Sequence, residues 1–390
     1  MLALRCRLSV KVPYGKQTIT QEDINAVVEV LKSDFLTQGP SVFKFEEEFA
    51  KAVGAKYAVA FCNATAALHT GFKALNKNTA KKVLVSSITF AASSNCVLYE
   101  GGEVEFVDID PTSFNLDLNI IEEKLKADPN AYQGIIPVDF AGLPVDTEKL
   151  KEIADRYNLW IMEDACHAVG GGFFNSKNEF IQCGSGKYSD LTVFSFHPVK
   201  HIATGEGGMI TTNSEEKYRH LLKLRSHGIE RDEKLFKVAS HGGWYHEMQE
   251  LGFNYRMSDI NAALGLSQLR HLKNNIEKRN AVAKTYKDFF SATGFSYQQY
   301  NDKKTVNAYH LFVIQTNKRR ELYDFLKKKE IYTQVHYIPV HKHPYYQENG
   351  FKEVKLPHAE NFYAKALSLP MYHGISEEEL TYVLKMIESF

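Results

Sequence analysis

Short apolar segments alternate with helix-like segments through the first half of the chain, and this alternation restricts the fold more than any other feature. The apolar segments predict strands at 59–61, 83–86, 104–108, 134–140, 159–164, 191–196 and 209–212. The segments between the first five predict helices at 64–75, 91–99, 118–125 and 147–157. Near-continuous apolar strands separated by helices are typical of a parallel sheet with both faces covered. The sequence therefore predicts an α/β fold built on a large, mostly parallel sheet.

Two helices are expected before this alternation. Thr20 is placed to cap a helix whose apolar residues recur every three or four positions up to Leu31. Ser41 is expected to open a second helix, which ends at Gly54.

A long helical pattern at 257–290 leads into a smaller C-terminal module. That module is expected to resemble a βαβ unit, with strands at 310–315 and 332–337, a helix between them at 319–329, and closing helices at 359–367 and 377–389. We therefore expect a large domain at 13–265 and a smaller C-terminal α/β domain at 266–390.

Composition excludes several classes of function. The 390 residues carry 47 basic and 47 acidic side chains, so no basic surface for nucleic acid or for a membrane is expected. Five cysteines without a C-x-x-C pair argue against a disulfide framework or a zinc site and favour a reducing compartment. The first 12 residues are interpreted as an extension without a catalytic role, and no membrane span is expected. We expect a cytoplasmic protein.

One lysine, Lys200, lies where an apolar strand gives way to a Gly-rich turn before the next strand. Two interpretations remain open. A lysine in an apolar pocket loses hydration, so its pKa falls and its amine becomes a nucleophile. Alternatively, a lysine at a strand end extends its amine to solvent.

Two further stretches have a possible chemical role. Residues 62–68 turn from a strand into a helix of small residues, where free N–H groups and the Thr65 hydroxyl can bind an anion or form an ordinary helix cap. Residues 161–168 place Glu163, Asp164 and His167 at the carboxyl end of a strand, where open α/β sheets bind ligands. Strand alternation sends the two carboxylates to opposite sides. Asp164 and His167 suit a metal, acid–base chemistry, a cofactor's ring nitrogen, or only a capped helix start.

Two other stretches can line a site. Phe90 follows a strand and either stacks on a flat ring or belongs to the core. Asn254 and Arg256 precede the long helical pattern and either bind an anion or belong to a helix start capped by Ser258 or Asp259.

Three histidines near the C-terminus do not predict a metal site. His336, His341 and His343 share a loop with prolines and lack a metal-binding pattern, so we expect them to face substrate or solvent. The sequence also lacks the P-loop, G-x-G-x-x-G and G-x-S-x-G motifs of nucleotide hydrolysis, hydride transfer and serine hydrolysis.

Taken together, these stretches suit pyridoxal phosphate. Lys200 would bond to the cofactor, and Asp164 would keep its ring nitrogen protonated. Phe90 would stack on the ring, while the turn at 63–65 and Ser195 would hold the phosphate.

Four motifs extend this interpretation to a family. They are Leu-Thr-Gln-Gly-Pro at 36–40, Glu-Asp-Ala-Cys-His-Ala at 163–168, the segment 195–208, and Gly-Phe-Asn-Tyr-Arg-Met-Ser-Asp at 252–259. In these motifs the chain resembles the DegT/DnrJ/EryC1/StrS sugar aminotransferases over nearly its whole length. The resemblance implies the fold of the fold-type I pyridoxal phosphate transferases. Cys166 stands where alanine is common in the family, and Lys200 stands where dehydratase-like relatives have histidine.

The resemblance also implies a role for individual residues. Lys200, Asp164 and His167 would be catalytic, with His167 near the phenolic oxygen of the cofactor. The residues implied to touch the phosphate are Ala64, Thr65, Ser195 and, from the neighbouring subunit, Asn254. The residues implied to line a nucleotide-sugar site are Tyr14, Asp34, Phe35, Leu36, Thr37, Arg256, His336 and Tyr337.

Within the family, the resemblance is to transaminases that aminate C4 of a UDP-linked 4-keto-6-deoxy-N-acetyl sugar in pseudaminic acid synthesis, on the way to glycosylated flagellin or another surface glycan. It implies a homodimer with shared active sites, L-glutamate as amino donor, and pyridoxamine phosphate formed between two half-reactions. The alternatives are a 3- or 4-aminotransferase for dTDP- or GDP-linked sugars, and a regulatory protein that binds the cofactor without turnover.

Overall fold

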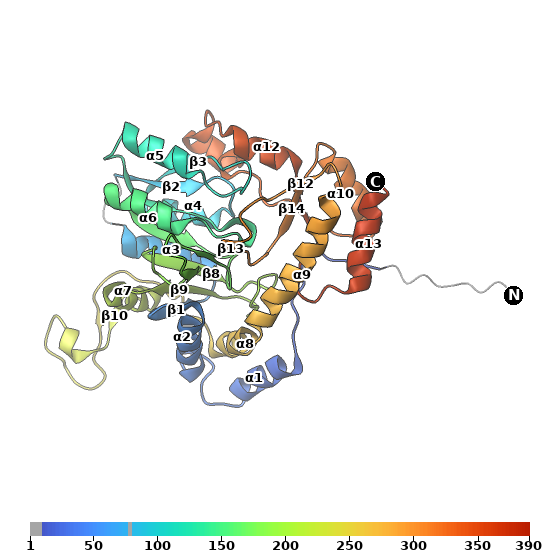
Figure 1. Cartoon of the computed structure of the whole chain (residues 1–390). Helices are drawn as coiled ribbons and strands as arrows, with labels where there is room; N and C mark the ends of the chain where they lie inside the picture. Colours follow the sequence, from blue (N-terminus) through green and yellow to red (C-terminus); the bar gives the residue numbers. More distant parts are fainter. Residues whose placement is uncertain (1–9, 77–79) are drawn as a thin grey trace.

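The computed structural model describes residues 10–76 and 80–390. A seven-stranded sheet lies at its centre, with the strand order β1–β9–β8–β5–β4–β2–β3 (Figure 1). The strands from β8 to β3 are parallel to one another, and β9 runs antiparallel to both β8 and β1. The prediction of a mostly parallel sheet is confirmed. The strands are β1 (Tyr57–Phe61), β2 (Lys82–Ser86), β3 (Glu103–Val107), β4 (Tyr132–Ile136), β5 (Trp160–Asp164), β8 (Leu191–Ser195) and β9 (Gly208–Thr212).

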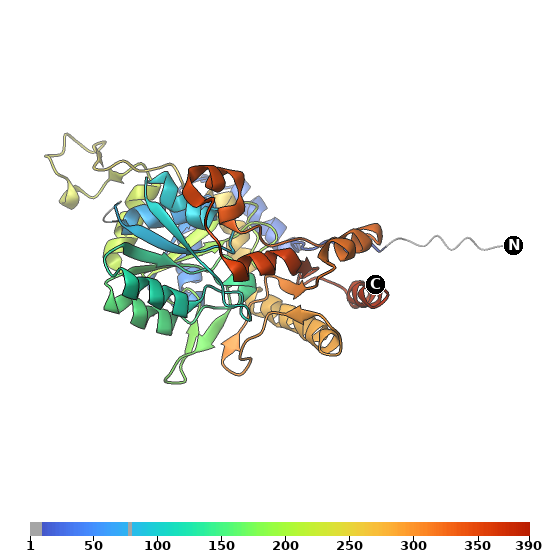
Figure 2. The ribbon, with the colours of Figure 1, turned by 90° about the horizontal axis from the view of Figure 1, so that it is seen from above.

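Helices cover both faces of this sheet (Figure 2), because successive side chains of each strand point to opposite sides. On β5, Met162 packs into one apolar cluster and Ile161 into another on the opposite face. The first face is covered by α3 (Ala64–Leu75), α4 (Ala92–Tyr99) and α7 (Glu215–Arg225). The other face is covered by α2 (Pro40–Val53), α5 (Leu118–Ala127) and α6 (Thr147–Arg156).

The predicted helix caps are largely confirmed. Thr20 caps α1 (Gln21–Leu31) in a reciprocal arrangement with Asp23, and Gly54 ends α2 with a φ of 77°. The start of α2 is corrected by one residue, from Ser41 to Pro40. Proline fits the first position of a helix because the N–H that it lacks would have no acceptor there.

The long helical pattern consists of two helices, α8 (Asp259–Leu269) and α9 (Leu272–Phe290). The helix α8 packs on α1 and α2, whereas α9 reaches the C-terminal core. Val12 is fully buried in that core and bridges to Ile331, so the part of the N-terminal extension that is described contributes to packing. The boundary between two domains near residue 265 stays a prediction.

The C-terminal sheet differs from the prediction. Its order is β12–β14–β15, and both strand pairs are antiparallel. The predicted strand at 332–337 is wrong, because β15 takes the place beside β14. Of residues 332–337, Gln334 alone forms a bridge, to Ser368 of β15. The segment has other contacts instead: Val335 packs on the core, while His336 and Tyr337 line a cavity. The predicted βαβ unit is therefore not formed.

The elements of this region are β12 (Ser296–Tyr297), β14 (Phe312–Gln315), α10 (Arg319–Lys328), α11 (Pro344–Tyr346), α12 (Pro357–Lys365), β15 (Ala366–Leu369) and α13 (Glu377–Glu388). Leu367, which was expected to end a helix, lies in β15. Short helical turns occur at Phe140–Gly142, Glu233–Leu235, Val340–Lys342 and Gln347–Phe351.

Two smaller features were not predicted. The strands β6 (Gly172–Phe174), β7 (Phe180–Gln182) and β13 (Thr305–Val306) form a three-stranded sheet. Between β10 (Ile229–Glu230) and β11 (Glu247–Met248), the chain forms an arm that projects from the body in both ribbon views (Figures 1 and 2). Within residues 10–76 and 80–390, no helix is both long and apolar enough to cross a bilayer.

Candidate active site

A cavity of about 480 Å³ lies where the parallel strands reach their carboxyl ends. Most of the residues singled out in the sequence line it. They are Tyr14, Ala64, Thr65, Phe90, Asp164, His167, Ser195, Lys200, His336 and Tyr337. Because these residues come from segments far apart in the chain, the fold is what brings them together.

The side chain of Lys200 lies in this cavity, in the turn between β8 and β9. Loss of hydration lowers the pKa of its amine to about 8, against the opposing effect of Asp164 and Cys166. A pKa near 8 leaves a useful fraction of the amine unprotonated at neutral pH. The interpretation of Lys200 as a solvated strand-end lysine is therefore not supported.

Asp164 and Glu163 point to opposite sides of β5, as the strand alternation predicts. Asp164 lines the cavity, where the Ser93 hydroxyl donates to its Oδ2 at 2.6 Å and the Cys166 N–H to its Oδ1 at 3.1 Å. Glu163 instead accepts hydrogen bonds from Thr192 (2.8 Å) and Ser189 (3.2 Å) beneath the sheet. Only Asp164 is placed to meet a ligand.

Glu163 belongs to a buried group of acids away from the cavity. A carboxylate oxygen of Glu163, a carboxylate oxygen of Asp139 and the sulfur of Cys183 all lie within 4.8 Å of one another. Burial and the neighbouring charge of Glu163 raise the pKa of Asp139 well above its ordinary value. Folding therefore favours the protonated form of Asp139.

Asp139→Asn is expected to stabilise the protein at neutral pH. The folded state keeps a proton on Asp139 that the unfolded chain releases above its ordinary pKa of 3.8, so wild-type stability falls as the pH rises beyond that value. Asparagine mimics the protonated acid and avoids this loss. Melting curves from pH 4 to 8 should show a gain of about 2 °C or more at the upper end that vanishes toward pH 4. The exposed Asp155→Asn variant should show no such trend, and a destabilised Asp139→Asn protein at pH 8 would contradict the assignment.

The start of α3 forms a small concave surface at the edge of the cavity. Asn63 caps the helix by accepting the Ala66 N–H at 2.8 Å, and helix geometry leaves the N–H groups of Ala64 and Thr65 without intrahelical acceptors. Gly208 of β9 lies against this turn, since a Cβ there would stand 2.7 Å from the Ala64 nitrogen. The turn is thus both a capped helix start and a place where an anion can bind.

Aromatic and imidazole side chains form the remaining walls. Phe90 is 63% exposed, so the interpretation of Phe90 as a core residue is wrong. The His167 Nε2 lies 3.0 Å from the Tyr337 hydroxyl, while the Ala141 N–H donates to His167 Nδ1 at 3.3 Å. Since Nδ1 accepts a hydrogen bond, the proton of the neutral ring is on Nε2 and is donated to Tyr337.

Burial sets the protonation of these groups. It lowers the pKa of His167 well below its ordinary value and that of His336 to about 3, in both cases with help from the charge of Lys200. It raises the pKa values of Tyr14 and Tyr337. At neutral pH the imidazoles are neutral and the phenols keep their protons.

One expectation about the C-terminal histidines is wrong. His336 lines the cavity and donates to or accepts from the Ser368 hydroxyl at 2.9 Å. His341, however, is fully buried and contacts Glu360 at 3.3 Å, so it faces neither the cavity nor solvent.

Sequence reasoning missed two residues next to the key groups. Ser93 binds Asp164 directly, and the small polar residues of the predicted helix at 91–99 were the available signal. His310 places its Nε2 3.4 Å from the Lys200 amine. The sequence predicts His310 as the first residue of a strand, which in the structure begins at Phe312, and nothing in its local sequence indicates this contact.

The other predicted site residues do not reach this cavity within one chain. Phe35, Thr37 and Arg256 line a separate cavity of about 500 Å³ that also includes Arg231. Asp34 and Leu36 are exposed in the same turn, and Leu36 accepts the Asp259 N–H at 3.0 Å. Asn254 is exposed and bridges to Ser226. Ser258 caps α8, so the motif at 252–259 also provides a helix start, as one interpretation held.

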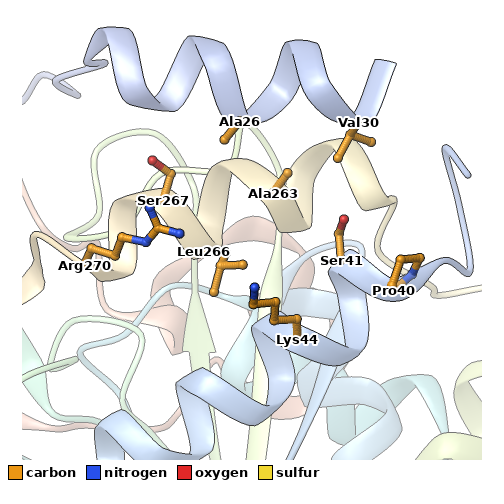
Figure 3. A pocket seen from close by; sticks show the side chains of 9 residues that line it. All are labelled: Ala26, Val30, Pro40, Ser41, Lys44, Ala263, Leu266, Ser267 and Arg270. Carbon is orange, nitrogen blue, oxygen red and sulfur yellow. The ribbon is translucent and has the colours of Figure 1, made fainter. Parts of the chain in front are cut away.

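A third hollow lies among α1, α2 and α8 (Figure 3). Its walls are largely small or aliphatic, and its charged side chains are Lys44 and Arg270. It contains none of the residues predicted to carry chemistry.

Comparisons with known proteins agree with this geometry. The profile of the DegT/DnrJ/EryC1/StrS aminotransferase family matches residues 17–388. Over 376 residues the chain is 36% identical to the UDP-4-amino-4,6-dideoxy-N-acetyl-beta-L-altrosamine transaminase of Campylobacter jejuni, a match that covers 95% of each protein.

Solved structures give the same result. Helicobacter pylori PseC, an aminotransferase involved in the biosynthesis of pseudoaminic acid, superposes with a TM-score of 0.87 at 30% identity, covering 98% of this chain and 100% of PseC. The PLP-form of Spr1654, a proposed sugar aminotransferase from Streptococcus pneumoniae, gives a TM-score of 0.87 at 25% identity, covering 97% and 98%. The protein is therefore a sugar aminotransferase that uses pyridoxal phosphate, and the chain belongs to the DegT/DnrJ/EryC1/StrS aminotransferase family.

Proposed function

We propose that this enzyme moves the amino group of L-glutamate to C4 of a UDP-linked 4-keto-6-deoxy-N-acetylhexose. The products are UDP-4-amino-4,6-dideoxy-N-acetyl-beta-L-altrosamine and 2-oxoglutarate. The observation that carries this proposal is the near full-length match to a transaminase named for that product, together with the similarity to PseC. The proposed reaction belongs to the synthesis of pseudaminic acid for flagellin or another surface glycan.

The residues of the lysine cavity fit pyridoxal phosphate. The unpaired N–H groups at the start of α3, with Thr65 and Ser195, suit its phosphate. The Asp164 carboxylate, oriented by Ser93, suits a protonated ring nitrogen. The exposed face of Phe90 suits the flat ring. The cofactor, once bound, supplies a ring that stabilises negative charge on the carbon that loses a proton.

The proton transfers are assigned to the chain's own side chains. The unprotonated amine of Lys200 accepts the proton from the α-carbon of glutamate. The lowered pKa of Lys200, about 8, makes this unprotonated form available. His167 stays neutral and donates through Nε2, which fixes the Tyr337 hydroxyl so that its own proton points into the cavity. Tyr337 is therefore placed to donate a hydrogen bond to a bound oxygen.

We place the nucleotide-sugar between two subunits. Tyr14, His336 and Tyr337 line the lysine cavity. Phe35, Thr37 and Arg256 line the second cavity of the same chain. The guanidinium groups of Arg231 and Arg256 suit a diphosphate, and Phe35 suits a base. A homodimer would let the second cavity of one subunit complete the lysine cavity of the other, with Asn254 reaching the phosphate.

Mixed dimers test the shared site. In a dimer of Lys200→Ala with Asn254→Ala subunits, one of the two sites is intact only if Asn254 acts across the interface. Subunits mixed at random should therefore regain about a quarter of wild-type activity, although each parent variant is inactive or weak. Reconstituted activity no higher than that of the two separate parents would show that Asn254 acts within its own chain.

A substrate panel tests the reaction. The purified enzyme with L-glutamate should show the pyridoxamine spectrum, and the UDP-linked 4-keto sugar should restore the original band and release the 4-amino sugar. Preference for a dTDP- or GDP-linked sugar, or amination at C3, would replace the proposed substrate. A protein that binds the cofactor but never responds to glutamate or to any sugar would be a regulatory relative. The cytoplasmic location stays a prediction.

A further inference from the structure

His310 is buried beside the catalytic lysine and has no part in the roles assigned above. Its side chain is 3% exposed, and its ring lies 4.4 Å from that of His167, measured between centroids. Its Nε2 makes a long hydrogen bond of 3.4 Å to the Lys200 amine.

The backbone of His310 is fixed from two sides. Arg279 of α9 donates to the carbonyl oxygens of Tyr309 (3.0 Å) and His310 (3.4 Å). On the other side lies Gly142, whose φ is 103° and where a Cβ would stand 2.5 Å from the Tyr309 nitrogen and 2.9 Å from that of His310. The segment is thus held in one place, with the imidazole aimed at Lys200.

Packing alone does not account for an imidazole at this position. Its Nδ1 is buried and has no hydrogen-bond partner within residues 10–76 and 80–390, which is costly for a polar atom. A phenyl ring would fill similar space without that cost. Within the same described residues, the polar contact that the imidazole makes through its side chain is the one to Lys200. The imidazole at this position is therefore explained by its contact with Lys200 rather than by packing in the core.

We propose that His310 is a positioning residue for Lys200: its Nε2 holds the amine in the cavity, beside His167, whenever that amine is not bonded to the cofactor. The inference rests on the role given to Lys200 in the proposed function and does not depend on which sugar is the substrate. In the reaction, it keeps the released amine close to the carbon from which it takes and to which it returns a proton.

The contact also affects the protonation of Lys200. A neutral imidazole that accepts a hydrogen bond favours the charged amine, as Asp164 and Cys166 also do, while Arg279 opposes that charge. Three further neutral rings face the lysine: those of His167, His201 and His336. Removing the imidazole should therefore lower the pKa of the amine.

Competitive labelling of the cofactor-free protein tests this without substrate. Trace acetic anhydride modifies only unprotonated amines. Mass spectrometry of the Lys200 peptide from pH 6 to 10.5 therefore gives the titration midpoint, the pH at which half of the Lys200 amine is protonated. We expect His310→Phe and His310→Asn to lower the midpoint by about one pH unit, because asparagine is too short to reach Lys200. His310→Gln, which can reach it, should return the midpoint toward the wild-type value. His373→Phe, at a histidine without a contact to Lys200, is the control and should leave it unchanged.

A second readout tests positioning. At pH 9.5, where the amine is mostly unprotonated in every variant, pyridoxal phosphate should bond to Lys200 at least about threefold more slowly in His310→Phe than in the wild type. A wild-type midpoint and a wild-type loading rate in His310→Phe and His310→Asn, with only a lower melting temperature, would overturn the proposal. Failure of the UDP-sugar assignment would leave these measurements unchanged, so the two proposals fail separately. If His310→Phe does not fold, the titration midpoints and loading rates of His310→Asn and His310→Gln are compared instead, and equal values in these two variants would overturn the proposal.

Discussion

Replacing Lys200 with alanine is expected to abolish amino transfer and leave the fold intact. Among the described residues that line the cavity, Lys200 supplies the one primary amine, so no other side chain there can bond to the cofactor or return the proton. We expect the release of 2-oxoglutarate to fall at least about 10⁴-fold. The fold should survive, because the amine lies in a cavity and, within residues 10–76 and 80–390, His310 supplies the one side chain to which it is hydrogen-bonded.

The measurement is 2-oxoglutarate formation with the preferred keto sugar, together with circular dichroism and a melting curve. Lys126→Ala is the matched control, because its side chain is 65% exposed on α5 and is not among the residues that line either cavity. It should keep full activity. Transamination by Lys200→Ala at more than a trace level would refute the assignment of the lysine.

Asp164→Asn is expected to have the second largest effect. Asparagine keeps the shape of the side chain but removes the negative charge that a protonated ring nitrogen requires. We expect kcat to fall about 100-fold or more, with a weaker hold on the cofactor. Single-turnover absorbance with glutamate reports the first half-reaction directly.

The neighbouring carboxylate gives the control for this experiment. Glu163→Gln changes an acid one residue away on the opposite side of β5, where it contacts Ser189 and Thr192 rather than the cavity. It should leave kcat within about threefold of the wild type. Equal losses in both variants would contradict a specific role for the carboxylate that faces the cavity.

The central sheet could be predicted because each of its strands is a short apolar segment that can be recognised in the sequence by itself. Apolar residues fill strands that are buried on both faces, and turn residues such as Gly54 end the helices beside them. For the same reason, Lys200 and Asp164 could be found, since each stands at the end of such a strand. Their chemistry follows from that position in the sheet.

The rest depends on contacts that no local pattern encodes. The sequence predicts a strand at 332–337, but the place beside β14 is taken by β15, which lies later in the chain. The contact of His310 with Lys200 joins residues 110 positions apart. Likewise, the separation of Arg256 from the lysine cavity within one chain follows from the shape of the whole domain.

The antiparallel strand β9 has a consequence for how the chain is made. At the edge of the sheet, β9 is the strand that neighbours β1, although the ribosome releases β1 first and β9 last of the seven strands. Until residue 208 has emerged, β1 is an apolar strand with no partner in the sheet, and such strands favour aggregation. Gly208 packs against the turn that follows β1, at the start of α3. The anion-binding edge of the cavity is therefore completed late in synthesis, and a chain truncated before β9 is expected to lack it and to aggregate.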